Sequence, residues 1–305
     1  MEIRRYIVGV DGSVPARAAI RWALAGARER GVGVTLVYVA DDEWGAVGSL
    51  LIDEVDQDAQ KRLADEVDYA RSLRPEAPIH GEVRFGSPMA ELASFSDAGT
   101  MVVVGTHKTG FHYGRAFGSR SLQLANLATG PVAIIPEAAS RMRRGVIVGV
   151  DDTPAGAAAV ELAADLACDH HCELMTVRSS ESHSPFDVDH DDERRDWQLR
   201  RDDEARGFLA SAVALARKRQ PGIVIRSRVV RRPAGAALNE LARSAELLVI
   251  GDSRRAKAQL GSLGAVAYDV LLNLSSPTIV VHAAPTEAES GAEQPETEGE
   301  SHVIG

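Results

Sequence analysis

The apolar positions of the chain form short runs rich in β-branched residues, and these runs alternate with longer amphipathic stretches. In the first part of the chain they predict strands over residues 6–10, 34–39, 79–84, 101–104 and 132–135. Between the second and third strands, residues 55–73 carry apolar side chains at helical spacing, with charged residues elsewhere. Strands that alternate with covering helices are typical of βα units around a parallel sheet.

The same pattern occurs twice along the chain. Three pairs of segments share it: YIVGVDGS (6–13) with VIVGVDDT (146–153), MVVVGT (101–106) with LLVIGD (247–252), and GPVAIIP (130–136) with SPTIVVH (276–282). We therefore predict an α/β protein with two tandem domains, over residues 1–138 and 145–284. Each is expected to be a doubly wound, Rossmann-like domain with a five-stranded parallel sheet in the order 3-2-1-4-5.

Local signals add to this prediction. Ser13 and Thr153 are good helix N-caps, and a proline follows each within the first helical turn. The last strands, VAIIP and TIVVH, are apolar edges, which favours antiparallel pairing of the two halves within one chain. For the same reason the isolated first half is expected to dimerise, and a homodimer of the whole chain stays open. Residues 285–305 are acidic with few large apolar groups, so we predict a disordered tail.

Charge and composition narrow the class of protein. The formal net charge of −10 argues against DNA or RNA as a partner, because a surface that neutralises phosphates needs a basic excess. The amino terminus has no signal-peptide core, and apolar runs such as LLVIG are far shorter than the roughly 20 residues of a membrane span. We expect a cytoplasmic protein without a nucleic-acid or membrane partner. The segment CDHHCE from Cys168 lacks the second ligand pair of a structural zinc site, so no metal site is predicted.

A candidate ligand site follows from the predicted topology. In an open parallel sheet, ligands bind beyond the carboxyl ends of the strands where the strand order reverses, here between strands one and four. Asp11 directly follows the first strand, and Gly105 lies at the end of the fourth. The chain continues as THKTGFHYGRAFGSRS, and its Gly-Ser pair precedes a helix-like segment. The free N–H groups at a helix start suit an anion such as phosphate.

These motifs resemble those of the universal stress protein family. The resemblance is carried by VGVDGS, by GTHKTGFHYGRAFGS and by GPVAIIP, and it extends to the second copy of the pattern. It implies that Asp11 and Val39 border the adenine and ribose of a nucleotide, and that Gly105, Gly118 and Ser119 wrap the ribose and phosphates. It also implies a stress-response protein with an adenine nucleotide as its partner, namely ATP, with or without Mg²⁺, as a regulatory ligand.

The chain departs from the family pattern at Lys108, which stands where the second glycine of the loop belongs. A lysine there prevents a close backbone approach, but its ammonium can serve a phosphate as a point charge. Arg120 can reach the same anion with its guanidinium group. His107 completes the set of candidate nucleotide-binding residues. The alternative is that Lys108 and Arg120 are ordinary solvated side chains.

The second copy departs further from the family pattern. Gly251 is followed by Arg254, Gly264 and Ala265, so the hydroxyl group of the Gly-Ser pair is lost, unless the loop shifts to use residues 261–262. We therefore expect ATP in the first half only, and a structural role for a degenerate second half. Two other functions stay open. One is a scaffold protein that binds no nucleotide, and the other is a slow ATP hydrolase.

Overall fold

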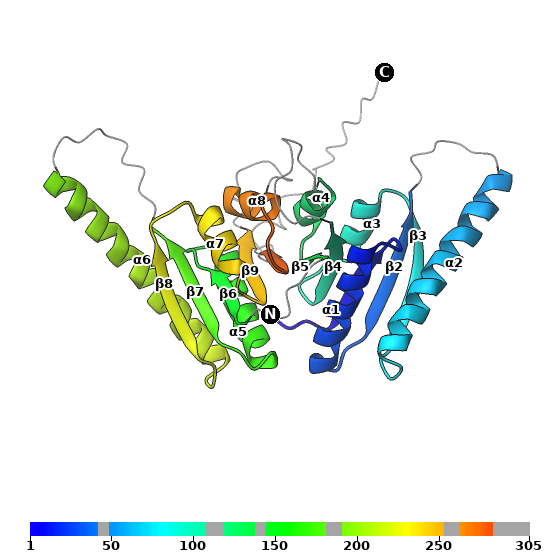
Figure 1. The fold of residues 1–305 in the computed structure, drawn as a ribbon, viewed down its shortest axis with the longest axis horizontal. Coiled ribbons are helices and arrows are strands. Elements are labelled where there is room, and N and C mark those ends of the chain that lie inside the picture. The colour runs from blue at the N-terminus through cyan, green and yellow to red at the C-terminus, as the bar shows by residue number, and fades with distance from the viewer. Residues whose placement is uncertain (42–48, 108–118, 138–143, 181–190, 253–262, 283–305) are drawn as a thin grey trace, which may run out of the picture.

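One sheet runs through both halves of the molecule (Figure 1). The computed structural model describes residues 1–41, 49–107, 119–137, 144–180, 191–252 and 263–282. In this part of the chain ten strands form a sheet in the order β3-β2-β1-β4-β5-β10-β9-β6-β7-β8. The predicted order 3-2-1-4-5 is confirmed in both halves, since the second half repeats it in reverse direction across the sheet. Within each half, neighbouring strands are parallel.

The two halves contain matching elements. The first comprises β1 (Arg5–Val10), α1 (Val14–Arg30), β2 (Val34–Ala40), α2 (Ser49–Leu73), β3 (Ile79–Phe85), α3 (Pro88–Ser94), β4 (Thr100–Thr106), α4 (Ser119–Leu127) and β5 (Val132–Pro136). The second comprises β6 (Val146–Gly149), α5 (Pro154–Asp169), β7 (Leu174–Ser179), α6 (Asp191–Arg219), β8 (Ile225–Val230), α7 (Ala234–Ala242), β9 (Leu247–Asp252), α8 (Ala265–Leu272) and β10 (Thr278–His282). The repeat seen in the sequence is thus a repeat of structure. The predicted tail lies outside the described residues.

Helices cover both faces of the sheet. The helices α1, α2, α5 and α6 pack on one face, where the buried side chains include Ile20 and Leu162. The helices α3, α4, α7 and α8 pack on the other face, around Leu124 and Leu238. The central strands are buried on both sides, which explains why the sequence shows them as continuous apolar runs.

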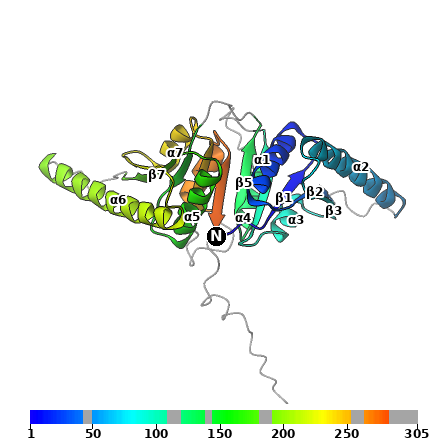
Figure 2. The same ribbon diagram turned by 90° about the horizontal axis from the view of Figure 1, so that it is seen from below.

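The strands β5 and β10 join the two halves. They pair antiparallel, with Ala133 opposite Ile279, and every residue of both strands is buried. The predicted pairing of the two apolar edge strands is therefore confirmed. Figure 2 shows α1 and α5 on either side of these central strands. Arg30 of α1 and Asp169 of α5 form an ion pair across the junction, with a nitrogen-to-oxygen distance of 2.6 Å.

The first helix of each half begins as predicted. Ser13 Oγ accepts a hydrogen bond from the backbone N–H of Ala16 at 3.3 Å, and Thr153 Oγ1 accepts one from Gly156 at 3.0 Å. A proline lies in the first turn of both helices, where its missing N–H costs no helical hydrogen bond. These caps place the amino-terminal ends of α1 and α5 beside the carboxyl ends of β1 and β6.

Gly105 and Gly251 hold equivalent positions near the ends of β4 and β9, and packing explains why both are glycines. A Cβ atom on Gly105 would lie 2.2 Å from the carbonyl carbon of Pro15 in α1. A Cβ atom on Gly251 would lie 2.6 Å from the backbone nitrogen of Gly156 in α5. Each glycine therefore lets a strand touch the first turn of a helix, whether or not a ligand lies nearby.

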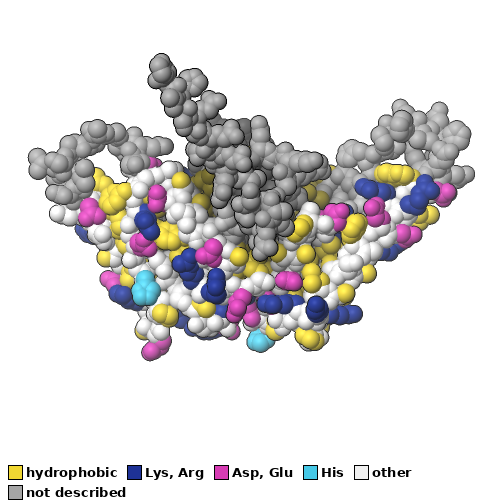
Figure 3. All heavy atoms as spheres, turned by 180° about the vertical axis from the view of Figure 1, so that it is seen from behind, with side chains coloured by type: hydrophobic (Ala, Val, Ile, Leu, Met, Phe, Trp, Pro, Cys, Tyr) yellow, Lys and Arg dark blue, Asp and Glu magenta, His cyan; other side chains and the backbone are white. Residues whose placement is uncertain are grey.

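The surface carries charges of both signs. In Figure 3 the acidic and basic side chains are interspersed over the visible face and do not separate into large patches. Among the described helices, none combines the length and apolar character needed to cross a membrane.

Candidate functional site

Three of the predicted site residues lie at the carboxyl ends of neighbouring strands. Asp11 follows β1, Val39 is near the end of β2, and Gly105 is near the end of β4. Asp11 is exposed, and its Oδ1 accepts a hydrogen bond from the backbone N–H of Ser13 at 3.0 Å. Val39 is half-buried against the core beneath α3 and α4. The structure thus brings these three residues to one edge of the first half.

The other predicted residues flank the loop between β4 and α4. His107 is exposed directly after β4. Ser119 begins α4, and Arg120 is exposed in the first turn of that helix. Lys108 and Gly118 lie outside the described residues, so their predicted roles stay predictions.

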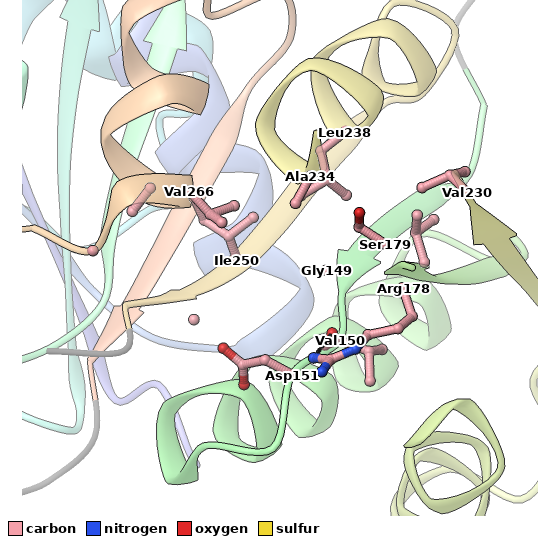
Figure 4. A pocket seen from close by; sticks show the side chains of 14 residues that line it. Gly149, Val150, Asp151, Arg178, Ser179, Val230, Ala234, Leu238, Ile250 and Val266 are labelled. Carbon is pink, nitrogen blue, oxygen red and sulfur yellow. Dashed lines mark hydrogen bonds between the residues drawn. The ribbon is translucent and has the colours of Figure 1, made fainter. Parts of the chain in front are cut away.

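The second half contains a cavity at the corresponding edge of its sheet (Figure 4). Its volume is about 150 Å³, and it lies among the ends of β6, β7, β8 and β9 and the first turns of α7 and α8. Apolar side chains form most of the wall: Val150, Val177, Val230, Leu238, Ile250 and Val266. Polar side chains come from Asp151, Arg178 and Ser179. The cavity therefore lies in the half for which the sequence indicated only a structural role.

The residues around this cavity are the counterparts of the predicted first-half site. The repeat pairs Asp151 with Asp11, Ser179 with Val39, Gly251 with Gly105, and Val266 with Arg120. The same edge of the fold is therefore lined by equivalent positions in both halves, and the side chains at those positions differ.

The two equivalent aspartates have different surroundings. Asp151 is half-buried, and its Oδ1 accepts hydrogen bonds from Thr153 Oγ1 at 2.7 Å and from the Thr153 backbone N–H at 3.0 Å. It lies so close to Gly156 that a Cβ atom there would come within 1.8 Å of Oδ1. Asp11 has Ala16 in the place of Gly156 and stays exposed. Thr153 thus holds Oδ1 of Asp151 in place, and the Asp151 side chain lies against the first turn of α5.

Arg178 carries the one positive charge among the described residues that line the cavity. Its Nη1 donates a hydrogen bond to the backbone oxygen of Val150 at 2.9 Å. The guanidinium carbon lies 4.5 Å from the centre of the Phe208 ring, a cation–π contact. Both contacts hold Arg178 beside β6 and α6. Arg178 lies in β7, and β6 stands between β7 and β9 in the sheet.

A buried acid stands at the end of β9, next to the start of α8. Asp252 Oδ1 accepts a hydrogen bond from the backbone N–H of Gly264 at 2.8 Å. Its Oδ2 lies 3.2 Å from Nδ1 of His282 in β10, and the two side chains are 0% and 4% exposed. Gly264 is the N-cap of α8, and the amino-terminal end of a helix attracts anions. The Asp252 carboxylate therefore occupies one of the backbone N–H donors at this helix end.

The first half has no acid at the corresponding place. Asp252 and His282 are paired in the register of β9 and β10, and their counterparts Thr106 and Pro136 are paired in the register of β4 and β5. Sequence reasoning missed Asp252, although the signal is visible where MVVVGT aligns with LLVIGD. At the last position of that alignment, the hydroxyl group of Thr106 in the first half corresponds to the carboxylate of Asp252 in the second half.

The two cysteines take no part in either site. Cys168 is exposed, Cys172 is half-buried, and both are free thiols. Burial raises the pKa of the Cys172 thiol, which makes its reactive thiolate form scarcer. Within the described ranges, no group of three or more His, Cys, Asp or Glu side chains is arranged to hold a metal ion.

Comparison with known proteins gives a consistent result. The Universal stress protein family profile matches residues 2–136 and again residues 142–282. Universal stress protein Rv1996 of Mycobacterium tuberculosis is 31% identical over 305 aligned residues, covering 90% of this chain and 93% of that protein. A crystal structure of a universal stress protein from Archaeoglobus fulgidus shares the fold at 17% identity, with a TM-score of 0.65 over 93% of this chain and 97% of its own.

One further solved structure is of a universal stress protein from Archaeoglobus fulgidus in complex with dAMP. It is 22% identical to this chain, with a TM-score of 0.35, and covers 46% of this chain and 98% of its own. Two matches to the family profile, together spanning nearly all of the described residues, agree with the duplicated fold. The chain belongs to the universal stress protein family, as a member with two tandem copies of the family's domain.

Proposed function

We propose that the chain is a stress-response protein whose first half binds an adenine nucleotide, ATP, as a regulatory ligand. One observation carries the proposal. Asp11, Val39, Gly105 and Arg120 occupy positions whose counterparts line a cavity in the second half. The resemblance of the loop after β4 to the loop of nucleotide-binding family members supports ATP as the ligand.

The charges at this edge of the first half favour a phosphate. Arg120 is exposed in the first turn of α4, where the helix dipole also attracts an anion. A guanidinium group can form two parallel hydrogen bonds to phosphate oxygens. Lys108, which lies outside the described residues, is proposed to add its ammonium to the same site. Asp11 is exposed directly after β1 and can accept hydrogen bonds from the ribose hydroxyl groups.

Titration of ATP and of adenosine into the full chain tests this function. Arg120→Ala should weaken ATP by about tenfold, because it removes a charge-assisted contact, and should leave adenosine within about twofold. Val266→Ala is the matched control, since it changes the equivalent position of the second half. ATP binding should be the same in this control as in the unchanged chain. Absence of ATP binding by the unchanged chain would contradict the proposal.

Lys108 gives a second test of the same site. Lys108→Ala should cost ATP about 1 kcal/mol of binding free energy and cost adenosine less, because the amine is proposed to contact phosphate. Lys108→Gly restores the glycine of the family pattern. If Lys108→Gly binds ATP more tightly than the unchanged chain, the lysine obstructs the site and does not serve it.

A further inference from the structure

We propose that Cys168 and Cys172 form a dithiol that exchanges with small-molecule disulfides, such as oxidised glutathione, and closes to an internal disulfide. They are the two cysteines of the chain, and they lie four residues apart where α5 ends. Both are free thiols in the structure. The pair belongs to the second half and precedes β7, so it shares no residue with the proposed ATP site.

A hydrogen-bonded turn brings the two cysteines together. The backbone N–H of Cys172 donates to the oxygen of Ala167 at 3.0 Å, and the backbone N–H of His171 donates to the oxygen of Cys168 at 3.1 Å. These are the two bonds of a Schellman motif, which folds the chain back over the last helical turn. Each cysteine is therefore tied to the residue that precedes the other one.

Closing the disulfide requires a small movement of the backbone. Residues three or four apart on a helical turn have Cβ atoms about 5–6 Å apart, and a disulfide needs about 3.5–4.5 Å. His171 lies between the two cysteines with a φ of 50°, in the left-handed region that side chains rarely adopt. The equivalent residue of the first half is Gly31, with a φ of 65°. The backbone that has to move is therefore already strained.

The first half has the same turn without the thiols. Arg28 and Val32 stand where the second half has Cys168 and Cys172. The two backbone hydrogen bonds recur there at 3.2 and 3.0 Å, with Gly31 in the left-handed position. The turn therefore forms without cysteine, and packing alone does not require two thiols in it.

Both cysteines are accessible to a small reagent. They line an open hollow of about 890 Å³, where Cys168 is exposed and Cys172 is half-buried against the core. The same hollow is lined by Arg144, Glu173 and Glu246, which offer charges of both signs. Glutathione is a short peptide that carries an ammonium group and carboxylates, so these side chains can pair with it.

The exchange proceeds in two balanced steps. The thiolate of Cys168 attacks one sulfur of oxidised glutathione, the glutathione disulfide breaks, and one reduced glutathione leaves. The thiolate of Cys172 then attacks the Cys168 sulfur of the mixed disulfide, and the second reduced glutathione leaves. The protein dithiol is oxidised, oxidised glutathione is reduced, and the two thiol protons end on the two glutathione molecules. Burial raises the pKa of the Cys172 thiol, so the second step should quicken as the pH rises.

The test uses the full chain, incubated with an excess of oxidised glutathione. Free thiols are then blocked with N-ethylmaleimide, and the intact mass is measured. The main product should be a chain that has lost two hydrogen atoms, carries no glutathione and takes up no maleimide, and reduced glutathione should restore both thiols. A chain that keeps a glutathione beside a free thiol, chains cross-linked to one another, or an absence of reaction would overturn the proposal.

Variants at the two positions assign the steps. Cys172→Ser should stop at the mixed disulfide, with one glutathione on Cys168. Cys172→Val, which introduces the first-half residue, repeats this test if the serine variant does not fold. Cys168→Ser leaves only the half-buried thiol and should take up glutathione at least about tenfold more slowly than the unchanged chain. Equally fast uptake by Cys168→Ser would overturn the order of the two steps.

Discussion

The two halves of the molecule share their elements, their strand order and the edge at which a ligand site is built, but they differ in charge at that edge. The differences are Thr106 against Asp252, Ser119 against Ala265, Arg120 against Val266, and Pro136 against His282. These positions lie at strand ends and in the first turn of a helix, and both halves keep the same strand order with either set of side chains. The same fold therefore carries two different sets of side chains at this edge.

The features that both halves keep are the ones that packing requires. Gly105 and Gly251 let β4 and β9 touch the first helix of their half. Ser13 and Thr153 cap those helices. Conversely, the acid at the end of β9 has a partner, His282, from the neighbouring strand. The difference between the halves thus involves two residues that are paired across neighbouring strands, as Thr106 and Pro136 are in the first half.

The largest expected effect concerns the edge of β5. It tests whether the first half pairs with a copy of itself as it pairs with the second half. Residues 1–138 alone expose the edge of β5, whose five residues are all buried in the whole chain. An exposed apolar edge favours pairing, so this fragment should dimerise with a Kd in the micromolar range, or about −8 kcal/mol. Sedimentation analysis measures this association. A stable monomer at micromolar concentration would count against β5 as a self-complementary edge.

The next effect is a loss of stability, and it tests the glycine that both halves have near the end of their fourth strand, Gly105 and Gly251. Gly105→Ala puts a Cβ atom 2.2 Å from backbone atoms of Pro15, and should reduce the free energy of unfolding by about 3 kcal/mol. Gly251→Ala meets backbone at 2.6 Å and should cost less, about 2 kcal/mol. Chemical denaturation in the absence of nucleotide measures both changes.

Gly207 provides the control for these substitutions. It lies in α6, and a Cβ atom there would meet nothing within 4 Å. Gly207→Ala should therefore stabilise the protein by about 0.5 to 1 kcal/mol through helix propensity alone. If Gly105→Ala were equally harmless, the packing explanation for the shared glycine would fail.

A further effect concerns the response of the second half to acid. Asp202 of α6 is 2% exposed and accepts hydrogen bonds from Ser180 Oγ at 2.7 Å, Gln198 Nε2 at 3.0 Å and Arg231 Nε at 3.1 Å. The Arg231 contact is the main reason why the pKa of the Asp202 carboxyl lies well below its usual value. Asp202→Asn should cost about 2 kcal/mol of unfolding free energy at neutral pH. This network fixes α6 to the end of β7, beside the cavity.

The sign of the pH dependence follows from that lowered pKa. The stabilisation by ionised Asp202 is fully present above the unfolded-state pKa of about 4, and it is lost as the pH falls toward the folded-state value. Between about pH 5 and pH 2 the unchanged chain should lose more stability than Asp202→Asn does. Denaturation curves at several pH values measure the difference. Equal losses in the two proteins would show that this carboxylate is not what makes the chain acid-sensitive.

The fold was predictable from the sequence because it depends on patterns that repeat. Apolar runs, helix caps and the two edge strands were each visible twice, and the structure confirms them. The candidate site at the carboxyl ends of the strands was predictable only in part. The sequence motif assigns Gly105 to a ligand site, whereas the close contact of Gly105 with Pro15 becomes apparent only when α1 is seen against β4.

The second-half cavity was beyond sequence reasoning for a related reason. Its wall is assembled from four strand ends and two helix starts that are far apart along the chain. The role of Asp252 depends on the position of Gly264, which is brought to it by the fold and not by local sequence. The alignment of the two halves shows that Asp252 adds a charge, but it does not show the hydrogen bond between Asp252 and the start of α8.

The most direct test of this account is the number of ATP molecules that the full chain binds at saturation. Equilibrium dialysis at low salt, where phosphate contacts are strongest, measures that number against the chain concentration. The account predicts one ATP per chain, bound by the first half, because the second half has Ala265 and Val266 where the first half has Ser119 and Arg120. Two ATP molecules per chain would contradict the expectation that the second half binds no ATP, and no bound ATP would contradict binding by the first half.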